Sequence, residues 1–133
     1  MTFILNLYHL EEPNLYMEYQ ILQEQAMKIS PAIRYATIID LNGRIKSSSH
    51  RKGVKNLLTS KESLQSLKTS ASIWKARKQI SGKIGKAKYA LAEYSKIKRI
   101  VIPLGDNHLL YLTTGPNADH AKIISKATKL KLK

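Results

Sequence analysis

The order of apolar and polar positions predicts helices at both ends of the chain and strands between them. In residues 14–29 apolar side chains recur every three or four positions, which is typical of an amphipathic helix. Ser30-Pro31 follows, and a residue before proline avoids helical geometry, so the helix should end there. Side chains in residues 33–40 follow the two-residue period of a strand, and the turn residues 40–43 (DLNG) then predict a β-hairpin over residues 33–49. The apolar stripe of the first helix is expected to be Leu15, Tyr19, Leu22, Ala26 and Ile29.

A second helix is predicted after the hairpin. Thr59 and Glu62 have the spacing of a capping box, in which each residue bonds the backbone N–H of the other. The helix that they begin should run to about Ser81, with Gly82 and Gly85 marking its end. Its buried stripe is expected to be Leu64, Leu67, Ala71 and Trp74.

Three further strands are predicted over residues 88–94, 98–104 and 108–114. The middle strand (KRIVIPL) carries a continuous apolar run, which indicates burial on both faces. Pro103 cannot donate a ladder hydrogen bond, so it should lie at a strand end or on an edge.

The order of these elements predicts the fold class. Asn117 or Asp119 can cap a final helix that runs to about Leu130. The order helix, strand, strand, helix, strand, strand, strand, helix favours an α+β fold, in which a five-stranded antiparallel sheet has flanking helices. We expect one domain over residues 14–133, preceded by an N-terminal extension of residues 1–13.

This order, with the hairpin ATIIDLNGRIKSS, the strands KRIVIPL and HLLYLTT and the closing helix DHAKIISKATKL, resembles the roadblock family of dynein-associated light chains. That family belongs to a broader profilin-like group, and the chain is most similar to small archaeal members of unassigned role. The resemblance implies a non-catalytic adaptor that dimerises through its central helix and the adjacent strand. It also implies a small GTPase, or a regulator of one, as partner. The chain departs from the pattern in the basic residues of its central helix, which are Lys68, Lys75, Arg77 and Lys78.

Composition restricts the chemistry. The chain has no cysteine, which excludes disulfides, thiol catalysis and thiolate metal sites, and which suits a cytoplasmic protein. The formal net charge is +14, from 23 Lys and Arg against 9 Asp and Glu. Residues 1–27 contain four acids and no base, whereas residues 63–133 contain 15 bases and three acids. This polarity favours an anionic partner, which is a nucleic acid, a membrane surface or an acidic protein.

No pattern of catalytic or metal-binding residues stands out. The four histidines have no metal-ligand spacing, although His108 and His120 could meet in space. No Gly-x-Ser-x-Gly elbow is present, and residues 82–86 (GKIGK) follow a helix, whereas a phosphate loop precedes one. The sequence therefore predicts a protein that is not an enzyme and has no cofactor.

Basic residues form two candidate sites for an anion or nucleic acid. One follows a face of the last helix, and the other lies around the end of the second helix. If the two clusters share a face, that arrangement favours binding of DNA or RNA through phosphates. The residues are Lys75, Arg77, Lys78, Lys83, Lys86 and Lys88, together with Lys122, Lys126, Lys129 and Lys133.

The first ten residues (MTFILNLYHL) are apolar but too short to span a membrane, and they lack the features of a signal peptide. They are expected to form an extra helical turn on the domain or an arm that binds a partner. Three functions stay open at this point. The first is a homodimeric adaptor or regulatory module with a basic surface, the second is a sequence-nonspecific nucleic-acid-binding protein, and the third is a profilin-like or PAS-like small-molecule sensor, which would need a cavity.

Overall fold

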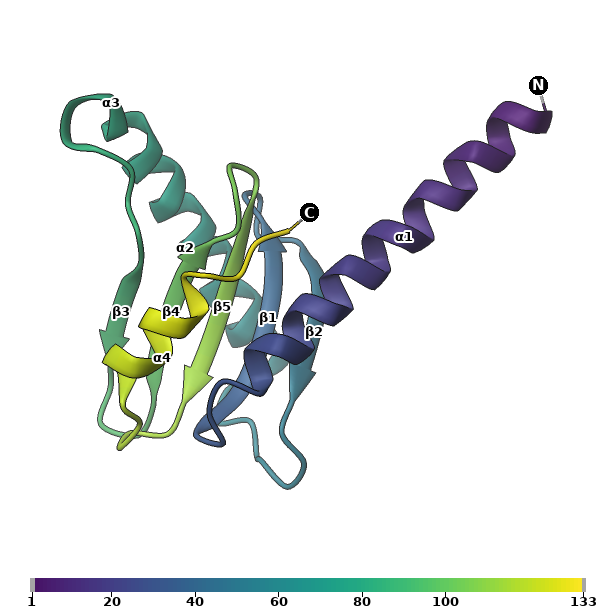
Figure 1. The fold of residues 1–133 in the computed structure, drawn as a ribbon. Coiled ribbons are helices and arrows are strands. Elements are labelled where there is room, and N and C mark those ends of the chain that lie inside the picture. Colours follow the sequence, from purple (N-terminus) through teal and green to yellow (C-terminus); the bar gives the residue numbers. More distant parts are fainter. Residues whose placement is uncertain (1, 133) are drawn as a thin grey trace.

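The computed structural model describes the backbone of residues 2–132 and the side chains of residues 15–132. Within this part of the chain the predicted order of helices and strands is confirmed, with one short helix added (Figure 1). The elements are α1 (Thr2–Met27), β1 (Ile33–Asp40), β2 (Ile45–His50), α2 (Ser60–Gln79), α3 (Ser81–Ile84), β3 (Ala90–Glu93), β4 (Lys98–Pro103), β5 (His108–Thr114) and α4 (His120–Ala127).

The five strands form one antiparallel sheet in the order β2-β1-β5-β4-β3. β1 and β5 are distant in sequence and belong to different hairpins, but they pair with each other near the centre of the sheet. In this pairing Ile38 lies opposite Leu110. β2 and β3 are therefore the edge strands. The predicted α+β fold with a five-stranded antiparallel sheet is confirmed.

Helices cover both faces of the sheet, and each face has its own core. On one face α1 and α4 pack on alternate residues of the central strands, among them Ile38, Ile100 and Leu110. On the other face α2 packs on the intervening residues, among them Ile39 and Val101. This confirms the prediction that the apolar run of β4 is buried on both faces. Pro103 ends β4, as the sequence predicts.

The first helix differs most from the expectation. α1 begins at Thr2, not at Asn14, so the helix includes most of the segment predicted as a separate extension. Pro13 lacks a backbone donor but does not end the helix. Figure 1 shows that the N-terminal half of α1 extends away from the sheet, while its C-terminal half lies on β1 and β2. Leu15, predicted as part of the buried stripe, is 46% exposed because α1 has passed the sheet at that point.

The second helix begins as predicted, because Thr59 and Glu62 form both hydrogen bonds of the capping box. It ends at Gln79, two residues early, and the short helix α3 follows. Gly82 lies inside α3, so only Gly85, whose φ is 94°, ends a helix as predicted. Leu64 was predicted to be buried but is 46% exposed, whereas the rest of its stripe is buried.

The remaining differences are at element ends. β3 is shorter than predicted by two residues at its start and one at its end, and β4 by one residue at its end. Asp119, not Asn117, caps α4, since its carboxylate accepts a hydrogen bond from the backbone N–H of Lys122. α4 ends at Ala127, earlier than Leu130, and a turn follows it.

Candidate functional site

A groove of about 920 Å³ lies between α2 and the strands β3 and β4. Val101 and Tyr111 form part of its floor, and Ile73 and Trp74 of α2 form part of its wall. A smaller hollow of about 180 Å³ adjoins it on the side of β1 and β2, and the two share Arg99 and Tyr111. The groove exists because α2 packs over the centre of the sheet and leaves the edge strand β3 largely uncovered.

Arg99 is the central polar residue of this groove. Its Nη1 donates a hydrogen bond to Oγ of Ser66 at 2.6 Å. Its guanidinium lies 5.8 Å from the ring centre of Tyr94 and 5.6 Å from that of Tyr111, within cation–π range of both. Among the described side chains, its Nε is the buried polar atom that lacks a hydrogen-bond partner. The contacts fix the guanidinium in the groove with part of its donor capacity unused.

The groove combines apolar surface with positive charge. Four bases line it, and the one acid, Glu62, is already held in the capping box. Tyr94 and Ile73 are 54% and 46% exposed, although both are large and apolar in character. Such a surface suits an apolar segment that carries carboxylates. The four bases are Lys61, Arg77, Lys96 and Arg99.

The edge of β3 next to the groove offers unpaired backbone groups. Tyr94 donates its N–H to the carbonyl of Ile97 at 2.8 Å, which closes the turn between β3 and β4. Because backbone groups alternate in direction along an antiparallel strand, Leu91 and Glu93 point their N–H and C=O groups to the open side. This open edge can pair with another strand.

The first predicted basic cluster is divided by its contacts. Lys75 Nζ donates to Oδ1 of Asn42 at 2.8 Å, and Lys78 Nζ donates to the carbonyl of Asp106 at 2.7 Å. Lys86 lies 3.8 Å from the carboxylate of Asp106 in an exposed ion pair. Arg77 is instead a groove residue, whose guanidinium lies 5.5 Å from the ring centre of Trp74. Lys83 and Lys88 are exposed.

The second predicted cluster lies on the other side of the molecule. Lys122, Lys126 and Lys129 are exposed, and Ile123, Ile124 and Ala127 are buried, as the sequence predicts. Lys133 lies outside the described residues. α4 and α2 cover opposite faces of the sheet, so the two clusters do not share a face. The condition under which the sequence favours phosphate binding is therefore not met.

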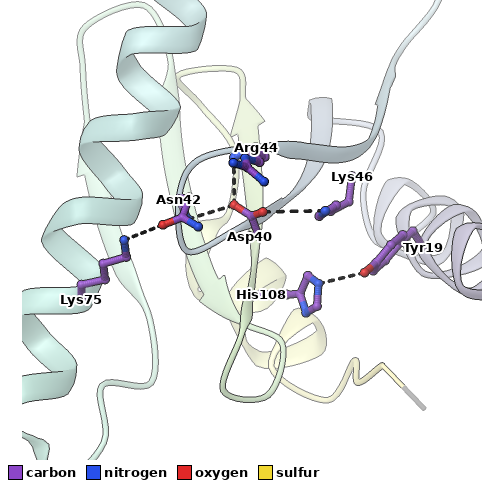
Figure 2. A network of polar contacts seen from close by, with 7 residues as sticks. All are labelled: Tyr19, Asp40, Asn42, Arg44, Lys46, Lys75 and His108. Carbon is purple, nitrogen blue, oxygen red and sulfur yellow. Dashed lines mark hydrogen bonds and ion pairs between the residues drawn. The ribbon is translucent and has the colours of Figure 1, made fainter.

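Polar contacts hold the β1–β2 turn and join it to Lys75 of α2 (Figure 2). Asp40 accepts hydrogen bonds from the backbone N–H groups of Asn42 and Arg44, at 2.9 and 3.0 Å, and forms an ion pair with Lys46 at 3.7 Å. Burial opposes ionisation of Asp40, but the hydrogen bonds from Arg44 and Asn42 and the charge of Lys46 outweigh it and lower the pKa of the carboxyl. The network holds the turn in one conformation.

His108 lies opposite Asp40 in the pairing of β1 with β5, and its Nε2 is 2.8 Å from Oη of Tyr19 on α1 (Figure 2). Burial, followed by the charge of Lys46, lowers the pKa of His108, although Asp40 acts in the opposite sense. Burial also raises the pKa of the Tyr19 hydroxyl.

The suggested meeting of His108 and His120 is wrong, because His108 begins β5, whereas His120 contacts Lys98, which lies opposite Thr114 at the other end of β5. His120 pairs with Lys98 instead, with Nδ1 and Nζ 2.9 Å apart. Within the described residues, no three His, Cys, Asp or Glu side chains gather as metal ligands would. None of the described helices is both long and apolar enough to cross a membrane.

Sequence reasoning missed Arg99 and the groove. The available signal was an arginine inside the apolar strand KRIVIPL, where a charged side chain needs partners. The exposed aromatic residues of the groove gave no signal, because the same residue types fill cores.

No protein-family model matches the chain, and no curated protein matches it in sequence. Solved structures do match its fold. The structure titled gliding protein MglB from Thermus thermophilus aligns with a TM-score of 0.69 at 17% identity, over 86% of this chain and 85% of that one. A Roadblock/LC7 domain from Streptomyces avermitilis aligns with a TM-score of 0.62 at 16% identity, over 81% of this chain and 89% of that one.

Profilin structures match as well. Schizosaccharomyces pombe profilin aligns with a TM-score of 0.55 at 14% identity, over 82% of this chain and 91% of that one. The structural matches therefore include both roadblock domains and profilins, the two groups that the sequence resembles. The similarity to archaeal members of the family stays a prediction. The chain has a roadblock-like fold of the broader profilin-like type.

Proposed function

We propose that this protein is a non-enzymatic, homodimeric adaptor or regulatory module of the cytoplasm. The observation that carries the proposal is the open edge of β3 beside the apolar groove of α2. Both features occur on the two elements through which the family resemblance implies dimerisation.

Pairing of β3 with the β3 strand of a second copy would satisfy the outward backbone groups of Leu91 and Glu93. It would also bring together exposed apolar residues beside that edge, and their burial favours association. These residues are Ile73, Ile80, Ile84, Tyr89 and Tyr94, each at least 46% exposed.

A small GTPase or another acidic protein is the partner that we propose for this module. The fold supports this through the resemblance, and the net charge of +14 supports an acidic surface on the partner. Nucleic-acid binding is the weaker alternative, because the basic clusters lie on opposite faces. A small-molecule sensor is also weaker, because the groove is an open trough along α2.

The solution mass tests the dimer. We expect twice the chain mass of 15.1 kDa at high micromolar concentration. Glu93→Pro removes an outward N–H without removing a bond to β4, so this variant should be monomeric. Glu93→Ala keeps that N–H and should stay dimeric, which controls for loss of the exposed carboxylate and its contact with Lys98. A monomeric wild-type protein, or a dimeric Glu93→Pro variant, would contradict the proposal.

A further inference from the structure

We propose that the N-terminal segment of α1, residues 2–14, inserts into one leaflet of an anionic lipid bilayer and attaches the protein to its surface. The contact uses the face of the sheet that carries α1 and α4, which is opposite to the face that carries α2. It goes beyond the proposed adaptor function, because neither the dimer nor its protein partner requires a lipid surface.

The helix α1 is apolar on several sides at the point where it leaves the sheet. Leu15, Tyr16 and Met17 follow one another in sequence and are 46%, 54% and 57% exposed. Successive residues of a helix point about 100° apart, so these three side chains cover more than half of its circumference. A protein surface covers one side of a helix, whereas the hydrocarbon of a bilayer surrounds it. This exposure therefore favours lipid over a second protein.

The residues that precede this point have the composition of a segment that enters lipid. Residues 2–10 (TFILNLYHL) contain no Asp, Glu, Lys or Arg, and Tyr8 is of a residue type enriched at membrane–water interfaces. Their backbone is helical, and Figure 1 shows it extending beyond the sheet. At 1.5 Å per residue they span about 13 Å, close to the half-thickness of about 15 Å of the hydrocarbon core. Glu11 and Glu12 follow and would remain at the headgroups.

Positive charge on the same face of the molecule would attract an anionic bilayer. α4 packs on the same face of the sheet as α1 through Ile123, Ile124 and Ala127, so its exposed lysines point away from the sheet. The acids of α1 give no such attraction, so α1 supplies the apolar contact and α4 supplies the charge. An apolar anchor together with a basic cluster gives stable attachment to anionic membranes. The lysines are Lys122, Lys126, Lys129 and Lys131.

The proposed dimer would strengthen this attachment. Two β3 strands that pair in antiparallel orientation are related by a twofold axis perpendicular to the sheet, so both copies of α1 and α4 lie on one side of the dimer. Both copies of α2 lie on the other side. Insertion of one segment would then hold the second segment close to the same bilayer. A monomer would insert as well, but with lower affinity.

Co-sedimentation of the full chain with vesicles of equal parts phosphatidylcholine and phosphatidylserine measures the binding. Ile4→Gln with Leu7→Gln removes two apolar side chains well before Tyr19, the first buried residue described in α1, so the fold should be unchanged. We expect binding to fall at least about ten-fold, because one aliphatic side chain that enters lipid contributes about that factor. Asn6→Gln with Asn14→Gln is the matched control, which changes two polar residues of the same segment and should bind like the wild type.

A fluorescent label reports insertion directly, because the chain has no cysteine of its own. An environment-sensitive dye on Asn6→Cys should brighten and shift to shorter wavelength when these vesicles are added. The same dye on Ser72→Cys, at an exposed position of α2, should not change. The triple reversal Lys122→Glu, Lys126→Glu and Lys129→Glu should weaken binding at least about five-fold, since each lysine near an anionic surface contributes about that factor.

Three results would overturn the insertion. The first is no binding to these vesicles. The second is binding that Ile4→Gln with Leu7→Gln does not weaken, which would mean adsorption by charge alone. The third is a dye signal at Asn6→Cys that appears without vesicles and rises with protein concentration, which would mean that another protein chain covers the segment. The solution mass of Glu93→Pro tests the β3 dimer separately, so the two proposals can fail independently.

Discussion

Tyr19 Oη and His108 Nε2 lie 2.8 Å apart, although 89 residues separate them along the chain. The hydrogen bond joins α1 to the start of β5, and the two rings are tilted with their centres 5.3 Å apart. Tyr19 is buried and His108 is half-buried, so the bond is partly protected from water. It anchors the point at which α1 leaves the sheet.

This contact predicts that acid destabilises the protein. The pKa of His108 is lowered below its ordinary value of 6.5 by burial and by Lys46, so the unfolded chain takes up the proton more readily. The contribution of neutral His108 to the free energy of unfolding is fully present above pH 6.5. It is lost as the pH falls from 6.5 through the lower pKa that His108 has in the folded protein. Urea unfolding at several pH values measures this loss, and His108→Gln should reduce the slope between pH 7 and 5. An unchanged slope would contradict the prediction.

Removal of the Tyr19 hydroxyl has a separate, pH-independent effect. Tyr19→Phe leaves the ring in place and removes one partly buried hydrogen bond, so we expect a loss of about 1 kcal/mol in the free energy of unfolding. Tyr16→Phe is the control, since Tyr16 is exposed on the same helix and should change stability little. Equal losses of stability in the two variants would mean that the loss comes from a general effect on α1 and not from the hydrogen bond between Tyr19 and His108.

Two glycines with similar backbone angles should differ in their tolerance of a side chain. Gly43 has a φ of 80° and Gly105 a φ of 75°, so alanine is strained at both, by about 1–2 kcal/mol. A Cβ at Gly43 would also lie 2.8 Å from Cα of Lys68, whereas nothing lies within 4 Å of one at Gly105. Thermal unfolding should therefore show a larger loss for Gly43→Ala than for Gly105→Ala. Equal losses would mean that α2 moves away at no cost.

Local patterns were sufficient to predict most of the fold. The alternation in residues 33–40 and the capping box of Thr59 depend on neighbours in sequence, and both are confirmed. The exposure of Leu15 and Leu64 depends on where the sheet ends beneath each helix, which periodicity does not contain. The spacing of the lysines along the sequence was sufficient to place them on one face of α4. It did not show that α2 lies on the other side of the sheet, because that depends on how the helices pack in three dimensions.

The groove was less predictable than the fold. Arg99 contacts Ser66 of α2, Tyr94 of the turn after β3 and Tyr111 of β5, which are three separate parts of the chain. A single sequence gives no pairing register between those elements, so the cluster is visible only in three dimensions. The open edge of β3 likewise follows from the strand order.

Lys98 should be more important for stability than the exposed lysines. It is only 7% exposed, and its Nζ donates to the carbonyl of Ala118 at 2.8 Å and contacts Nδ1 of His120. Lys98→Met keeps the apolar stem but leaves these acceptors without a donor, at a cost of about 1–3 kcal/mol. Lys88→Met, at an exposed position, should change stability little in the same urea titration. A Lys98→Met variant as stable as the wild type would show that water replaces the ammonium group.

The separation of the basic clusters limits any binding to nucleic acid. A DNA duplex that contacts α4 does not reach the lysines around α2, since the sheet lies between them. About 0.9 unit of log–log salt slope accompanies each neutralised phosphate, so four exposed lysines predict a slope no steeper than about −4. These four are Lys122, Lys126, Lys129 and Lys131.

Fluorescence anisotropy of a labelled duplex over a salt series measures this slope. The triple reversal Lys122→Glu, Lys126→Glu and Lys129→Glu should remove most of the binding without unfolding the domain, because these side chains are exposed. Lys28→Glu, Lys52→Glu and Lys55→Glu together give the same net charge at exposed positions elsewhere, and should weaken binding less. A slope near −9 would mean that about ten phosphates are contacted. Both clusters would then have to bind one nucleic acid, and the division of the basic surface by the sheet would not limit binding.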